Sequence, residues 1–204
     1  PVVFESPQVY SNYWPFPSTI EAADVNGDQR LDLVFTSGTR GVGTWVWADY
    51  GPSVGILLGQ PGGTFAPATM YASDGDLCGL VVKDLDGDGV KDVAVGNMAL
   101  GGVTVLLNQD DGSGTFHPAV SYRSNSSGDA TVGVDAGDLN GDHLIDLVVA
   151  QSNTSTVGVL LGNGDGTFKP AVSYATGGMH PLYGLKLADF EADGKLDVVL
   201  GNGI

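Results

Sequence analysis

Four short stretches of this chain carry oxygen-bearing side chains at one repeated spacing. Each is nine residues long and begins with aspartate, and the first aspartates lie 60, 54 and 51 residues apart. Aspartate, asparagine or glutamate occupies positions 1, 3, 5 and 9 of every stretch. In chain order we name them loop 1 (24–32), loop 2 (84–92), loop 3 (138–146) and loop 4 (189–197).

Carboxylate and amide oxygens at this spacing can wrap one hard cation, with position 7 adding its backbone carbonyl. Calcium suits such a set because it accepts about six to eight oxygens in flexible geometry, whereas magnesium demands a near-octahedral shell. Asp, Asn and Gly are also ordinary turn formers, but four stretches in register favour a metal. The predicted ligands are Asp24, Asn26, Asp28, Arg30, Asp32, Asp84, Asp86, Asp88, Val90, Asp92, Asp138, Asn140, Asp142, Leu144, Asp146, Asp189, Glu191, Asp193, Lys195 and Asp197.

Loops 1 to 3 share two further features that support a wrapped conformation. Glycine at position 4 lets the backbone fold inward at positive φ. An apolar residue at position 2 is expected to point away and anchor the loop to the core. Loop 4 keeps the apolar residue as Phe190, but Glu191 replaces the short residue at position 3 and Ala192 replaces the glycine. The sequence therefore predicts three to four calcium ions, the fourth depending on loop 4.

The composition limits the class of partner. Acidic residues outnumber basic ones 24 to 8, which gives a net charge of −16. Such a surface repels nucleic acid and anionic membranes, and it suits divalent cations. No apolar run approaches the ~18 residues needed to span a bilayer, so no membrane insertion is expected. Cys78 is the only cysteine, so an internal disulfide is excluded.

The loops lie between segments that are typical of short strands. Alternating apolar residues precede the last three loops, and a continuous apolar run follows every loop. A third apolar segment and a fourth, running from a phenylalanine to a tyrosine, complete each of the first three repeats. The fourth segments contain Pro67, Pro118 and Pro170, which suits outer edge strands because proline cannot donate to a ladder.

Four strands per repeat, with the edge strand last, are typical of a propeller blade. We therefore predict an all-β fold, a β-propeller of four-stranded blades with about three and a half blades present. The chain is interpreted as one propeller segment, 1–204, and its expected parts are an outer strand 4–10, blades 18–71, 78–122 and 132–174, and a half blade 183–201. This is roughly half of a larger ring, whose remainder comes from the same or another chain.

The repeats also share a glycine-rich turn before the fourth segment. The turns read Gly-Gly-Thr-Phe (62–65), Gly-Ser-Gly-Thr-Phe (112–116) and Gly-Asp-Gly-Thr-Phe (164–168). Together with the loops, they resemble the FG-GAP/VCBS repeat family, and the chain is similar to integrin α-chain propellers and to some fungal and bacterial lectins. The resemblance implies a seven- or eight-bladed ring, usually outside the cytoplasm, with calcium between the first two strands of a blade.

Because neighbouring strands alternate in direction, the loops and the glycine-rich turns should share one face. The opposite face carries a long insertion after the first loop, from roughly 38 to 53, and an aromatic segment before it. Exposed aromatics there could stack on a sugar or bind a protein, or they could cover the end of the ring. The candidate ligand-binding residues are Trp14, Trp45, Trp47 and Tyr50.

Nothing in the sequence indicates catalysis. His117, His143 and His180 lie in an edge strand, a loop and a linker, and no nucleophile motif or histidine-rich zinc spacing accompanies them. We expect a calcium-binding, extracellular or cell-surface adhesion module that is not an enzyme and binds a protein or carbohydrate. A lectin, or a non-catalytic propeller domain of a polysaccharide-active enzyme, is the alternative.

Overall fold

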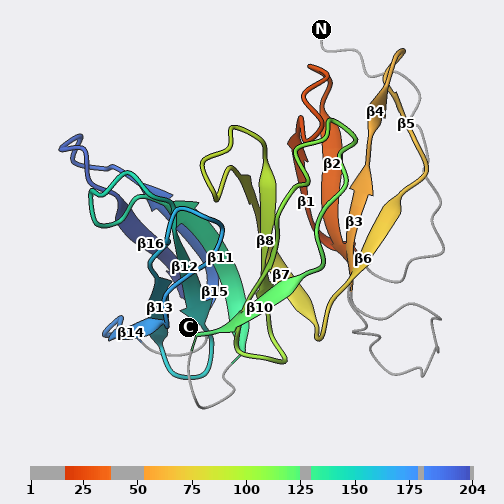
Figure 1. Ribbon diagram of the computed structural model, residues 1–204. Helices are drawn as coiled ribbons and strands as arrows, with labels where there is room; N and C mark the ends of the chain where they lie inside the picture. Colours follow the sequence, from red (N-terminus) through yellow and green to blue (C-terminus); the bar gives the residue numbers. More distant parts are fainter. Residues whose placement is uncertain (1–16, 38–52, 125–129, 179–181, 203–204) are drawn as a thin grey trace, which may run out of the picture.

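The computed structural model describes residues 17–37, 53–124, 130–178 and 182–202 (Figure 1). These residues form antiparallel strands joined by turns, with no helix among them, so the predicted all-β fold is confirmed. Accordingly, none of the described residues belongs to a helix that could cross a membrane.

Three four-stranded sheets and one two-stranded sheet follow each other along the chain (Figure 1). The first contains β1 (Pro17–Ala23), β2 (Asp32–Ser37), β3 (Ser53–Leu57) and β6 (Thr69–Ala72). The second contains β7 (Leu77–Lys83), β8 (Asp92–Asn97), β9 (Gly102–Leu106) and β10 (Val120–Arg123), and the third contains β11 (Thr131–Gly137), β12 (Asp146–Gln151), β13 (Thr156–Leu160) and β14 (Val172–Ala175). The last pairs β15 (Leu182–Ala188) with β16 (Asp197–Asn202), and a short hairpin pairs β4 (Gly59–Gln60) with β5 (Thr64–Phe65). Each four-stranded sheet runs in chain order, as in a propeller blade, which confirms the predicted partial propeller.

The first strands of successive blades, β1, β7, β11 and β15, lie beside one another. We expected these strands to bury one face only, but Val81 and Asp135 on their other face are buried as well. Neighbouring first strands cover them. A register shift at Gly79, repeated in the other first strands, also interrupts the alternation that the sequence indicated.

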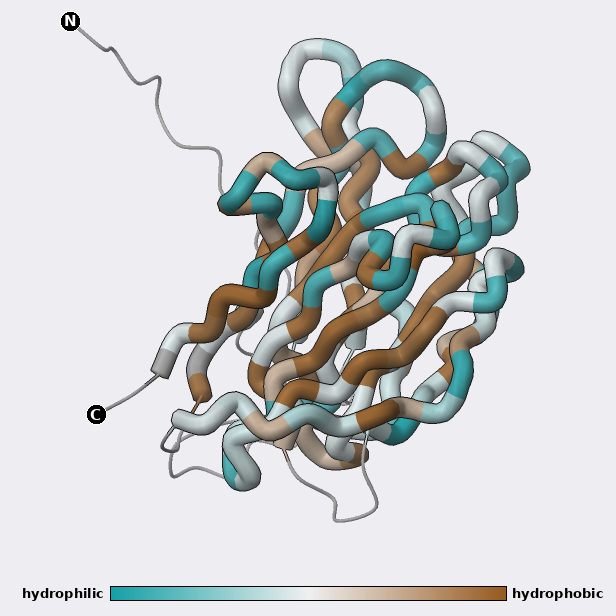
Figure 2. The backbone as a smooth tube through the Cα atoms, turned by 90° about the vertical axis from the view of Figure 1, so that its left-hand side faces the viewer, coloured by the Kyte–Doolittle hydropathy of each residue, from teal (hydrophilic) through white to brown (hydrophobic). Residues whose placement is uncertain are grey.

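The core lies between blades rather than within one sheet. Val34 of β2 belongs to the same buried cluster as Val95 of β8, and Val103 of β9 to the same cluster as Val149 of β12. Figure 2 shows brown, hydrophobic segments running through the middle of the fold, with teal, hydrophilic turns mainly at one end. The runs after loops 1 to 3 are buried on both faces, as predicted. The run after loop 4 is not, because Val198 and Val199 of β16 are exposed.

The fourth strands are shorter than the sequence suggested. Phe65, Phe116 and Phe168 do not begin them; each pairs with the residue two places beyond the end of the third strand. The proline then separates this bridge from the edge strand, since it offers no N–H to continue the ladder.

Two of these phenylalanines contact the preceding blade. The Phe116 ring packs edge-on against Tyr71 at a centroid distance of 5.5 Å, and its N–H donates to the Tyr71 hydroxyl at 3.0 Å. Phe168 makes the same ring contact with Tyr122 at 5.5 Å. These contacts fix the angle between blades and therefore the positions of the loops.

Candidate metal centres

Each loop is organised around the carboxylate at position 1. In loop 2 the Asp84 carboxylate accepts the N–H of Gly87 at 2.7 Å and the N–H of Gly89 at 3.0 Å. Equivalent pairs of bonds, from positions 4 and 6, occur in loops 1 and 3. In loop 4 the Asp189 carboxylate accepts the N–H groups of Asp193 and Gly194, at positions 5 and 6. Two or more backbone donors per carboxylate draw a nine-residue segment into a closed turn, which explains why aspartate begins every loop.

Position 4 behaves as predicted where it is glycine, because Gly27, Gly87 and Gly141 all have positive φ. Ala192 adopts the same conformation at φ 55°, although its side chain disfavours it. Position 6 also has positive φ in every loop, a requirement that the sequence analysis missed. The residues there are Gln29, Gly89, His143 and Gly194.

Loop 2 is the one in which three carboxylates converge. Single oxygens of Asp84, Asp86 and Asp88 lie within 4.8 Å of one another. Burial and the neighbouring charges of Asp88 and Asp84 raise the pKa of the Asp86 carboxyl. Close, partly desolvated carboxylates of this kind repel each other unless a cation neutralises them. Their oxygen donors fit the hard cation that the sequence predicted.

Loops 1 and 3 have the same shape with one carboxylate fewer. Asparagine replaces Asp86 at position 3, and its amide bonds to position 5 at both ends. Asn26 donates to Asp28 at 3.0 Å and accepts the Asp28 N–H at 3.2 Å. Asn140 and Asp142 are joined in the same way, each bond measuring 2.9 Å. In these loops the amide takes the place of the third acidic group.

The aspartate at position 9 was predicted as a calcium ligand, but in the structure it accepts backbone hydrogen bonds. Both oxygens of Asp92 accept backbone N–H groups, from Leu85 at 2.7 Å and from Asn108 at 2.8 Å. Asp32 and Asp146 join position 2 to the end of the third strand in the same way. All three are fully buried, and desolvation raises the pKa of Asp92 to about 6. These hydrogen bonds hold each loop against its blade. The role of the three aspartates as metal ligands stays a prediction.

In loops 1 and 4 the residue at position 7 has a basic side chain, which would compete with a metal ion for the position 5 carboxylate. Arg30 pairs with Asp28 and also donates to the Gly59 carbonyl at 3.0 Å. Lys195 pairs with Asp193 at 3.2 Å. Loops 2 and 3 have Val90 and Leu144 at this position. The basic side chains were visible in the sequence, but only the backbone carbonyl of position 7 had been considered.

Loop 4 differs from the others in its surroundings. Among the described residues, Asp197 accepts one hydrogen bond, from the Phe190 N–H at 3.1 Å, and its side chain is exposed. Val25 and Leu85 at position 2 are buried as predicted, whereas Phe190 is 67% exposed, so the expected anchoring is wrong for loop 4. None of the described residues forms a third strand beside β16 that would cover Phe190.

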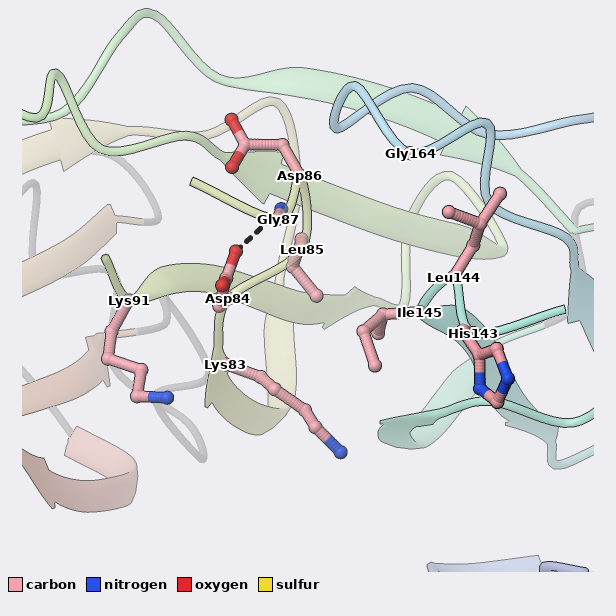
Figure 3. Close-up of a pocket in the computed structure, with 10 residues that line it drawn as sticks. All are labelled: Lys83, Asp84, Leu85, Asp86, Gly87, Lys91, His143, Leu144, Ile145 and Gly164. Atoms are coloured by element: carbon pink, nitrogen blue, oxygen red, sulfur yellow. Dashed lines mark hydrogen bonds between the residues drawn. The ribbon is translucent and has the colours of Figure 1, made fainter. Parts of the chain in front are cut away.

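Loops 2 and 3 line a shared cavity of about 300 Å³ (Figure 3). Figure 3 shows the Asp84 carboxylate turned back to the Gly87 N–H, with Lys83 just below it and with Leu144 and Ile145 of loop 3 on the opposite side. Lys83 also donates to the Ala136 carbonyl of the next blade at 2.9 Å. Gly164 of a glycine-rich turn lines the same cavity, so this turn and the loops share one face, as strand alternation requires.

The predicted aromatic patch lies outside the described residues. Trp14, Trp45, Trp47 and Tyr50 all fall within the stretches 1–16 and 38–52, as does the expected outer strand 4–10.

The repeat and its loops can now be compared with known proteins. The FG-GAP-like repeat matches this sequence three times, over residues 24–95, 84–149 and 138–200. The chain belongs to the FG-GAP repeat family. Each match begins at a loop and ends in the second strand of the following blade. The FG-GAP unit therefore begins after the first strand of a blade, whereas the structural blade begins with that strand.

Two solved structures are similar to this FG-GAP chain. One is an Agrocybe aegerita lectin, described as recognising non-reducing terminal N-acetylglucosamine, with 23% identity and a TM-score of 0.59. The match covers 89% of this chain and 46% of the lectin, so the chain spans less than half of that protein. The other, the Photorhabdus luminescens Tc holotoxin pore, has 19% identity, a TM-score of 0.44 and coverage of 96% and 11%. No curated protein matches the sequence.

Proposed function

We propose that this chain is a calcium-binding segment of a β-propeller that serves as an extracellular binding and adhesion module, without catalytic activity. The observation that carries the proposal is the convergence of Asp84, Asp86 and Asp88 in one closed loop. Calcium would supply the positive charge that these carboxylates lack. Its role is structural, because each loop joins the first two strands of a blade.

The exposure of the loops supports the proposed location outside the cell. The loops are largely exposed and short, and two of them hold one carboxylate fewer than loop 2. Extracellular modules bind calcium weakly, at about 10⁻⁴ to 10⁻³ M, and such sites fill only where calcium is abundant. A weak, exposed site therefore suits a secreted protein.

A direct test of the calcium proposal counts bound ions. Native mass spectrometry of the chain with calcium is expected to show three to four ions. Asp86→Ala should remove one, because it breaks the three-carboxylate group. Asp111→Ala is the matched control, since Asp111 is an exposed aspartate in a glycine-rich turn outside the loops. A chain that binds no calcium, or that loses an ion equally in both variants, would contradict the proposal.

The second candidate function is carbohydrate binding. It is favoured by the shared fold with the Agrocybe aegerita lectin, which extends over 89% of this chain. The aromatic residues in the sequence, above all Trp45 and Trp47, would supply the stacking surface. A glycan array that includes terminal N-acetylglucosamine distinguishes a lectin from a protein-adhesion module. If the aromatic residues bind the sugar, Trp45→Ala should weaken binding by about 2 kcal/mol or more without changing the calcium count.

A further inference from the structure

The two asparagines of the loops are each followed by glycine. Asn26-Gly27 lies at positions 3 and 4 of loop 1, and Asn140-Gly141 at the same positions of loop 3. In this dipeptide the glycine nitrogen can attack the asparagine Cγ, because no side chain on the second residue hinders the approach. The new N–Cγ bond closes a succinimide ring, and the side-chain nitrogen leaves as ammonia. Water then opens the ring to aspartate or isoaspartate.

We propose that Asn26 and Asn140 are deamidation sites whose reactivity is controlled by closure of their own loops. The aspartate product would give loops 1 and 3 the Asp-x-Asp-Gly-Asp pattern that loop 2 already has as 84–88. Deamidation would thus convert the two amide loops into three-carboxylate loops. The isoaspartate product would instead lengthen the backbone by one carbon and open the loop.

In the closed loop both reacting groups, the glycine N–H and the asparagine side-chain amide, are held by hydrogen bonds. In loop 1 the Gly27 N–H donates to Asp24 at 2.8 Å, which directs the attacking nitrogen at a carboxylate. The Asn26 amide is held at both ends by Asp28. Loop 3 repeats this arrangement, with the Gly141 N–H donating to Asp138 at 2.7 Å. Attack on Cγ therefore requires these hydrogen bonds to break first.

A third pair, Asn163-Gly164, is an internal reference. It lies in a glycine-rich turn, where the Asn163 amide donates to the Thr167 hydroxyl at 2.9 Å. Within the described structure the Gly164 N–H is not held by a position 1 carboxylate. This pair should therefore deamidate in the folded chain at a rate that does not depend on the carboxylates of Asp24 and Asp138.

The main test removes the bond that holds the attacking nitrogen. Asp24→Ala frees the Gly27 N–H, and peptide mapping by mass spectrometry at mildly alkaline pH follows the mass gain at each asparagine. We expect faster deamidation at Asn26 and unchanged rates at Asn140 and Asn163. Asp138→Ala should accelerate Asn140 alone. Unchanged rates at both asparagines in the two variants would overturn the proposal.

Variants that unfold would accelerate all three sites together, so a second measurement uses the unmodified chain. This arm rests on the proposed calcium binding. Calcium at about ten times its Kd should suppress loop opening, and hence deamidation at Asn26 and Asn140, about tenfold, with no effect on Asn163. If calcium binds to the chain by titration and the two rates do not fall, the inference is wrong. If titration shows no binding, the proposed function fails, and the inference is then decided by the Asp24→Ala and Asp138→Ala rates.

Discussion

Loop 2 and loop 4 carry the same nine-residue pattern but lie in different surroundings. Loop 2 belongs to a complete blade, where Asp92 is fully buried and bonds to Leu85 and Asn108. In loop 4 Asp197 bonds to Phe190, its one partner in the described part of the chain, and is exposed. The backbone folds similarly in both, so the spacing of the aspartates suffices to close a loop. What loop 2 gains from the third strand of its blade is a second hydrogen bond and the burial of position 9.

The largest expected difference between the two loops concerns position 9. Asp92→Ala leaves two buried N–H groups without an acceptor, at about 1 to 3 kcal/mol each, so the free energy of unfolding should fall by several kcal/mol. Asp197→Ala should cost much less, because its carboxylate is exposed and holds one bond. Urea unfolding in chelator, which removes any calcium contribution, measures both. Equal losses would show that the clasp to the third strand contributes little.

The next effect compares how much calcium is lost when the residue at position 3 of loops 2, 3 and 4 is replaced by alanine. Asp86→Ala and Asn140→Ala should each lose one calcium ion, and each lost ion removes about 1.4 kcal/mol of stability at tenfold excess over Kd. Glu191→Ala should lose less than one ion, because Lys195 already pairs with Asp193 in loop 4. Metal stoichiometry and melting with and without chelator measure these losses. Identical losses in the three variants would mean that loop 4 is as good a site as loop 2.

Sequence periodicity was sufficient to predict the blades and loops, because both depend on local patterns. Glycine at position 4 predicted the positive φ of Gly87, and the apolar run at 93–95 predicted a strand buried on both faces. What failed depends on neighbours that are distant in sequence. The second bond of Asp92 requires Asn108, beyond the third strand, and the N–H bond of Phe116 requires Tyr71 from the preceding blade. No pattern within the nine-residue loop contains the first contact, and none within one repeat contains the second.

A smaller effect compares two tyrosines at equivalent places in the blades. Tyr71 accepts the Phe116 N–H, whereas Tyr174 of β14 is 54% exposed. Tyr71→Phe keeps the ring contact and removes the acceptor, so it should cost about 1 kcal/mol. Tyr174→Phe should have no measurable effect. Chemical unfolding of both variants tests this, and a comparable loss at Tyr174 would show that it has a partner that the described residues do not include.

The smallest expected effect is a dependence of stability on pH that changes sign with calcium. Without calcium, the folded pKa of Asp92 is about 6, above its ordinary value of 3.8, so the folded state binds this proton more tightly than the unfolded state. This group therefore stabilises the fold below pH 4, and the contribution is lost as pH rises through about 6. Part of it is cancelled by Asp138, whose pKa is lowered by the backbone N–H of His143 and which favours the fold at higher pH.

Calcium should reverse the slope, because it binds deprotonated carboxylates and is displaced by protons. The melting temperature in chelator should therefore be higher at pH 5 than at pH 7, and in excess calcium it should be lower at pH 5. Asp92→Asn is the matched variant, since it keeps the size of the side chain and cannot titrate. It should remove the Asp92 contribution to the slope in chelator, so that the melting temperature no longer rises as strongly toward pH 5, and leave the calcium-dependent slope that the remaining loop carboxylates produce. An unaltered slope in chelator would mean that Asp92 is not the group responsible.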